Sequence, residues 1–131
     1  MAAMDRTGIF ELAVHGGCGV LREMQRLLSE EKTQEERKKL VNVVSSFQDF
    51  KQVSPLWVAC YLGHVDIVKW LARQGADVDH KEFDAGWTPS HAAAAGGHAI
   101  ILETLGSHNA NLSSLDDSAR TPLHVAAEWG R

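Results

Sequence analysis

The sequence predicts an all-α fold, a solenoid of stacked helix-turn-helix units joined by short extended fingers. The first observation is a proline that recurs at intervals of 34 and 33 residues, at Pro55, Pro89 and Pro122. The second is a glycine that follows each proline eight residues later, at Gly63, Gly97 and Gly130. Self-similarity at a period of about 33 residues is typical of stacked repeats.

Each unit begins with a predicted helix start, at Ser54, Thr88 and Thr121. A hydroxyl at the N-cap accepts a hydrogen bond from the first turn, and the proline that follows fits the first helical position. The glycine then ends this first helix, because glycine readily adopts the left-handed conformation of a helix end.

A second helix is predicted after each of these glycines. Its apolar residues follow a helical spacing, at Ile67, Val68 and Leu71 in one unit and at Ile101, Leu102 and Leu105 in the next. Gly75 and Asn109 end these helices, since asparagine is the usual substitute for glycine in the left-handed conformation.

The repeated segments resemble the ankyrin repeat over residues 51–131. The Thr-Pro-Leu-His-x-Ala-Ala pattern of that repeat is present at residues 121–127. Its Gly-His, Ile-Val-x-x-Leu and Gly-Ala-x-Val segments are present, in that order, in the unit that begins at Ser54. The residues that match the motif are Pro55, Gly63, Thr88, Pro89, His91, Gly97, Thr121, Pro122 and His124.

This resemblance implies that the motif histidines brace loops by hydrogen bonding. It also implies binding of a partner protein through the fingers and the exposed positions of the first helices. The chain departs from the motif where Trp57 replaces histidine, Ser90 replaces leucine and Gly106 replaces a second leucine. We expect looser packing at these three positions.

The chain is expected to divide into five parts. Residues 1–32 read as a degenerate capping repeat, 33–50 as a helical insert, 51–83 and 84–116 as full repeats, and 117–131 as a truncated repeat. Thr33 and Glu36 form a predicted capping box at the start of the insert. Its apolar stripe is Leu40, Val43, Val44, Phe47 and Phe50. The stripe is expected to pack on the repeats, with partner binding as the alternative.

The end of the sequence leaves the last unit without its second helix. A repeat array is expected to end with a polar capping unit. We therefore expect either that the chain is the start of a longer protein or that another chain covers this end.

Composition excludes several function classes. The net charge of −4 over 131 residues disfavours a nucleic-acid partner, which would need a basic stripe. No apolar run is long enough to span a bilayer, and the start lacks the pattern of a signal peptide. With only two cysteines, Cys18 and Cys60, a cytoplasmic protein is expected, with the nucleus as the alternative.

The residues that could suggest a catalytic or metal site are explained by their positions in the repeat. His91 and His124 share one repeat position and His64 and His98 another, so the histidines do not predict a metal site. The glycines around Cys18 lack the rest of a phosphate loop. We expect no catalytic residue, metal ion, cofactor or small-molecule substrate, and hence no enzyme.

A protein-protein interaction scaffold is the predicted function, with a protein or peptide bound on the concave finger and first-helix face. The candidate partner-binding residues are Tyr61, Leu62, Phe83, Asp84, Trp87, Asp117, Arg120, Glu128 and Trp129. For Trp87, packing between neighbouring fingers is an equal alternative. The alternative functions are a regulatory or substrate-recognition segment of a larger enzyme such as a ubiquitin ligase, and a structural component of a cytoskeletal assembly.

Overall fold

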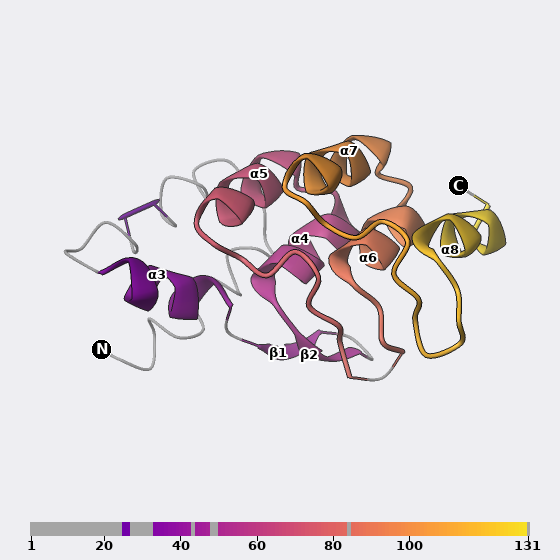
Figure 1. Cartoon of the computed structure of the whole chain (residues 1–131), viewed down its shortest axis with the longest axis horizontal. Helices are drawn as coiled ribbons and strands as arrows, with labels where there is room; N and C mark the ends of the chain where they lie inside the picture. Colours follow the sequence, from indigo (N-terminus) through magenta and orange to yellow (C-terminus); the bar gives the residue numbers. More distant parts are fainter. Residues whose placement is uncertain (1–24, 27–32, 43, 48–49, 84, 131) are drawn as a thin grey trace.

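The computed structural model describes residues 25–26, 33–42, 44–47, 50–83 and 85–130 (Figure 1). Its elements are α3 (Gln34–Val41), β1 (Ser45–Phe47), β2 (Phe50–Val53), α4 (Pro55–Leu62), α5 (Val65–Arg73), α6 (Pro89–Gly96), α7 (Ala99–Ser107) and α8 (Pro122–Glu128). The all-α repeat fold is confirmed, with one short hairpin added. The expected capping repeat at 1–32 falls almost wholly outside the described residues.

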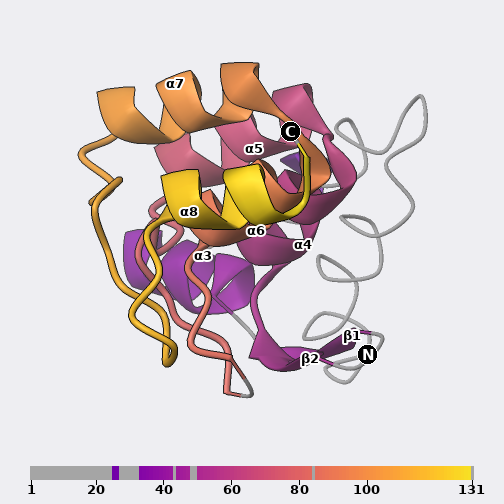
Figure 2. The same cartoon turned by 90° about the vertical axis from the view of Figure 1, so that its right-hand side faces the viewer.

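The helices are arranged in two rows. The first helices α4, α6 and α8 form one row, and the second helices α5 and α7 lie above it (Figure 1). Seen end on in Figure 2, the connections before α4, α6 and α8 all extend to the side opposite the second helices. The predicted fingers and first helices therefore share one side of the stack.

Each first helix begins at its predicted N-cap. The backbone N–H of Trp57 donates to Ser54 Oγ at 3.2 Å, that of His91 to Thr88 Oγ1 at 3.4 Å, and that of His124 to Thr121 Oγ1 at 3.3 Å. Gly63 and Gly97 end α4 and α6 at φ of +86° and +77°. Caps and left-handed glycines were both predicted from the sequence, and both predictions are confirmed.

Small residues let the first helices approach one another closely. Ala59, Ala92 and Ala93 are fully buried in the core that α4 and α6 form. The second helices add Ile67, Val68, Leu71, Ile101 and Leu105, all buried. Removing this apolar surface from water is the main stabilising contribution to such a stack. Trp70 on α5 is also buried and packs in this core.

The insert differs from its prediction. We expected one helical segment over 33–50, but α3 ends at Val41 and an antiparallel hairpin follows, with Ser45 opposite Val53 and Phe47 opposite Phe50. The reason is the run Val44-Ser45-Ser46, because a β-branched valine favours a strand and the side chains of serine compete for backbone hydrogen bonds and so disfavour a helix interior.

The predicted apolar stripe of the insert is therefore wrong as a helical face. Val44 is exposed, and Phe47 and Phe50 lie on paired strands. Val43 lies outside the described residues. Val41, at the end of α3, is buried and packs in the core of the repeats. Across the described part of the chain, no helix has the length and apolarity needed to cross a membrane.

Candidate functional site

Two fingers are braced by a buried carboxylate. In the second finger (residues 81–87), Glu82 Oε1 accepts from the N–H groups of Ala85 at 2.6 Å and Trp87 at 3.2 Å. In the third finger (residues 115–120), Asp116 Oδ1 accepts from Ser118 at 2.9 Å and Arg120 at 2.8 Å. The carboxylate of the second finger stands one residue farther from its N-cap than that of the third finger. Glutamate has one methylene group more than aspartate, and this extra length spans the difference.

The turn of every finger needs a left-handed residue two positions before the N-cap. Gln52, Gly86 and Ala119 occupy this position at φ of +58°, +70° and +59°. Only glycine adopts this region freely, so Gln52 and Ala119 hold it at a cost of about 1–2 kcal/mol each. The surrounding hydrogen bonds thus determine the finger shape more strongly than local preference does.

Neighbouring fingers are joined along their backbones. The N–H of Phe83 donates to the carbonyl oxygen of Lys51 at 2.9 Å, and that of Asp117 donates to Ala85 at 2.9 Å. Lys81 Nζ adds a bond to the carbonyl oxygen of Leu115 at 2.9 Å. The fingers therefore form one connected surface.

A row of aromatic rings runs beneath this surface. Tyr61 stacks on Trp57 at 5.6 Å between ring centroids, Trp57 on Trp87 at 6.5 Å, and Trp129 meets Trp87 edge-on at 5.9 Å. Such pairs add about 0.5–1.5 kcal/mol each beyond the area they bury. The rings come from α4, from the second finger and from the end of α8.

Trp87 is a packing residue. Its side chain is only 4% exposed, and its indole N–H donates to Asp116 Oδ2 at 3.1 Å. Of the two roles predicted for it, the structure selects packing between fingers, because a ring enclosed by two other tryptophans presents little surface to a partner. Its place among the partner-binding residues is corrected accordingly.

Arg120 is likewise occupied within the fold. Its Nε lies 3.0 Å from Asp116 Oδ2, and Nη1 bonds Glu128 Oε2 on α8. The hydrogen bond to Glu128, followed by the contacts with Asp116, raises the pKa of the Arg120 guanidinium. Arg120 therefore ties the third finger to α8, a role that the sequence did not predict.

The titration of Asp116 and His91 follows from their surroundings. Burial raises the pKa of Asp116, but hydrogen bonds from the backbone of Arg120 and Ser118 outweigh it and hold the pKa below its usual value. Burial lowers the pKa of His91. The neutral ring accepts from the N–H of Thr88 at Nδ1, 3.2 Å away, and donates from Nε2 to the carbonyl oxygen of Arg120 at 2.7 Å.

The remaining predicted partner-binding residues lie around this network. Phe83 is 64% exposed on the second finger, Trp129 is 46% exposed at the end of α8, and Asp117 and Glu128 are exposed as well. Tyr61 and Leu62 are half-buried against the core. Asp84 lies outside the described residues.

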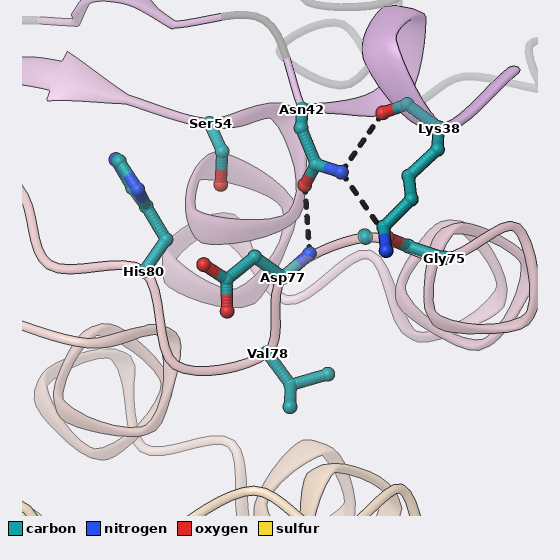
Figure 3. A pocket seen from close by; sticks show the side chains of 8 residues that line it. Lys38, Asn42, Ser54, Gly75, Asp77, Val78 and His80 are labelled. Carbon is teal, nitrogen blue, oxygen red and sulfur yellow. Dashed lines mark hydrogen bonds between the residues drawn. The ribbon is translucent and has the colours of Figure 1, made fainter. Parts of the chain in front are cut away.

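One hollow was not anticipated from the sequence (Figure 3). It measures about 510 Å³ and lies between α3 and the loop after α5, lined by Lys38, Asn42, Ser54, Gly75, Ala76, Asp77, Val78 and His80. Asn42 holds its two walls together: its amide donates to the carbonyl oxygen of Gly75 at 3.1 Å, and its Oδ1 accepts from the N–H of Asp77 at 2.7 Å. The only sign of this bridge in the sequence is that Asn42, at the end of α3, is polar.

The described residues offer little for covalent or metal chemistry. Burial raises the pKa of the free thiol of Cys60, which keeps it protonated. Within the described ranges, no three side chains of histidine, cysteine, aspartate or glutamate come together as a metal site would require. What the arrangement does offer is a rigid surface with exposed aromatic and charged groups.

Comparison with known proteins agrees with the observed repeats. A family profile for ankyrin repeats in many copies matches residues 56–105. The chain is similar to the inactive serine/threonine-protein kinase TEX14 of Mus musculus, at 44% identity over 78 residues, 60% of this chain and 5% of that protein. It is similar to ankyrin repeat and SOCS box protein 11 of Homo sapiens, at 36% over 91 residues, 67% of this chain and 27% of that protein.

A third similar protein is protein phosphatase 1 regulatory subunit 12A of Mus musculus, at 36% identity over 73 residues, which are 56% of this chain and 7% of that protein. The matched region thus spans less than a third of each of these relatives. The likeness concerns the repeats that these larger proteins contain.

Proposed function

Because this chain is a member of the ankyrin-repeat family, we propose that it is an interaction scaffold that binds a partner protein through its finger and first-helix face. Ankyrin repeats generally mediate protein-protein interaction and are non-catalytic modules. The proposal adds which face of this chain does so. A protein or peptide is the proposed ligand, rather than a nucleic acid, a membrane or a small-molecule substrate.

The observation that carries the proposal is the exposure of two aromatic side chains, Phe83 on the second finger and Trp129 at the end of α8. Both belong to elements tied into the same surface, Phe83 through its bond to Lys51 and Trp129 through its contact with Trp87. Aromatic side chains dominate the binding energy of protein interfaces. In this chain they stand on the fingers and at the end of a first helix.

Rigidity favours the same face. The bonds between neighbouring fingers and the aromatic row beneath them hold its backbone in place before a partner arrives. A surface that is already ordered loses less conformational entropy on binding, so more of the contact energy appears as affinity.

A regulatory role within a larger enzyme or enzyme complex is the second candidate. The observation that favours it is that relatives of this chain include a phosphatase regulatory subunit and an inactive kinase. Under this proposal the repeats still bind a protein, and that protein carries the catalytic activity or its substrate. We also propose a cytoplasmic or nuclear location, supported by the free thiol of Cys60.

Hydrogen-deuterium exchange on a captured complex tests the binding face. The full chain is used to capture a partner, and the amide exchange of the chain is then compared with and without it. The proposal predicts slower exchange in residues 81–87, 115–120 and 127–130. Slower exchange confined to α5 and α7 would place the binding surface on the second helices instead.

A further inference from the structure

Trp129 and Glu128 lie at the same end of α8 and converge on one network. Consecutive helical residues diverge by about 100° around the axis, yet Glu128 is tied to the third finger through Arg120 and Trp129 to the second finger through Trp87. Glu128 bonds Arg120, Arg120 bonds Asp116, Asp116 accepts from the indole of Trp87, and Trp87 contacts Trp129. This closed chain of contacts fixes an exposed indole beside an exposed carboxylate.

The surface around them carries an excess of negative charge. The described carboxylates of the two fingers and the end of α8 are Glu82, Asp116, Asp117 and Glu128. The cations on the same segments are Lys81 and Arg120. These segments thus carry four negative groups, of which Asp117 and Glu128 are exposed and Glu82 and Asp116 lie buried behind them, against two positive ones. A partner with a positive side chain is therefore electrostatically favoured here.

The carboxylate of Glu128 is available for a second contact. Its side chain is 55% exposed, whereas that of Asp116 is fully enclosed. Only Oε2 is engaged by Arg120, and a carboxylate can accept several hydrogen bonds through its two oxygens. An incoming donor can therefore bond Glu128 while Arg120 keeps its bond to Asp116.

We propose that Trp129 and Glu128 together receive an arginine side chain of the partner protein. A guanidinium stacks on an indole face through cation-π attraction, and its planar fork matches a carboxylate. Arginine satisfies both groups at once, whereas lysine offers a point charge without a stacking plane. This inference rests on the proposed protein-binding function and adds the chemistry of one contact.

The test uses the full chain and three short peptides that differ at one position. The peptides are acetyl-Gly-Arg-Gly-amide and its citrulline and lysine analogues, where citrulline has the shape of arginine without its charge. Binding is followed through the indole N–H signals in a nitrogen-15 spectrum, with the Trp129 signal assigned from a Trp129→Phe variant. We expect a saturable shift of the Trp129 signal with the arginine peptide, a weaker one with lysine, and none with citrulline.

Variants measure the contributions of Glu128 and Trp129 to peptide binding one at a time. Glu128→Gln keeps a partner for Arg120 and should weaken binding of the arginine peptide by about fivefold to tenfold, in line with a charge-assisted hydrogen bond. Trp129→Leu should weaken it by a similar factor, and because this variant lacks the Trp129 signal its binding is followed through the indole N–H signal of the neighbouring Trp87. Glu103→Gln, an exposed glutamate on α7, is the matched control and should leave binding unchanged.

Two results would overturn the arginine contact. One is an equal shift with the citrulline peptide, which would identify an uncharged occupant of Trp129. The other is no shift with the arginine peptide up to tens of millimolar. Either result leaves the exchange experiment on the captured partner unaffected, so failure of this inference is distinguishable from failure of the proposed binding face.

Discussion

The indole N–H of Trp57 donates to the carbonyl oxygen of Trp87 at 3.0 Å, and His91 Nε2 makes the equivalent bond to Arg120 at 2.7 Å in the next unit. Trp57 and His91 occupy the same repeat position, and each acceptor directly precedes the next N-cap. Tryptophan therefore replaces histidine without losing the bond between units. The looser packing expected at Trp57 is wrong, because the ring is fully buried between two other aromatic rings.

Replacing Trp57 with phenylalanine should lower the free energy of unfolding by about 1–3 kcal/mol, because the variant loses a buried hydrogen bond and part of a buried ring. The carbonyl group of Trp87 keeps its second donor, the backbone N–H of Glu82. Urea denaturation of the variant measures this loss. Trp129→Phe is the control, since Trp129 is half exposed and donates no such bond in the described structure. Equal stability of Trp57→Phe and the parent chain would show that the bond is not needed.

At the left-handed finger positions, replacing glycine by alanine should destabilise the fold, whereas replacing alanine by glycine should not. Gly86→Ala should lower stability by about 1–2 kcal/mol, because alanine is strained at positive φ. Its Cβ would also clash with Asp117 Oδ1, so that side chain has to move. Ala119→Gly should not lower stability, since relief of strain offsets the entropy lost by glycine. Thermal melting of both variants checks this, and a larger loss for Ala119→Gly would contradict the shared turn geometry.

Removing the hydroxyl group of Ser90 should stabilise the folded protein. The residue is fully buried in α6, and its Oγ has no hydrogen-bond partner among the residues that the structure describes. A buried hydroxyl without a partner costs about 1–3 kcal/mol, and alanine is the better helix former. Ser90→Ala should therefore raise the free energy of unfolding by about 1 kcal/mol. A loss of stability in the same urea assay would show that the hydroxyl is satisfied in solution.

Stability should fall as the solution is acidified below neutral pH. Burial lowers the pKa of His91 in the folded state from its ordinary 6.5. Below 6.5 the unfolded chain binds a proton that the folded chain resists, so stabilisation is full above this pH and is lost as pH falls towards the folded pKa. Asp116, Lys81 and Arg120 are the charged groups that act on this ring, Asp116 opposing the shift and the two cations adding to it.

His91→Gln tests the origin of this pH dependence. The variant is expected to be less stable at neutral pH, yet its urea midpoint should change less between about pH 7.5 and pH 5.5 than that of the parent. Asp116 contributes separately and only at lower pH, because its depressed pKa lies below the ordinary 3.8. Parallel pH profiles for the parent and the variant would assign the loss to other groups.

Much of the repeat could be predicted because its determinants are local. Thr88, Pro89 and Gly97 fix where α6 begins and ends through their own backbone and side-chain preferences. The bracing carboxylates Glu82 and Asp116 escaped prediction, since their partners are backbone N–H groups that leave no mark on the sequence.

The candidate site was harder to predict than the fold. Whether Trp87 faces a partner or the core depends on rings that come from other units, Trp57 and Trp129. Arginine is a residue type common in binding sites, but the side chain of Arg120 is bound by two carboxylates of the same chain, Asp116 in its own finger and Glu128 on α8. Phe83 and Trp129 stay exposed because no neighbouring element covers them in the described structure.

The most direct test of the binding face compares two pairs of exposed residues against one captured partner. Phe83 and Trp129 are replaced by alanine on the finger and first-helix side, and Lys69 and Glu103 on the second helices, with each variant melted to verify folding. Affinity is measured by calorimetry. We predict that the first pair weakens binding by about 1–3 kcal/mol for each hot-spot residue, while the second pair leaves it unchanged. Loss of binding in the second pair alone would contradict the account.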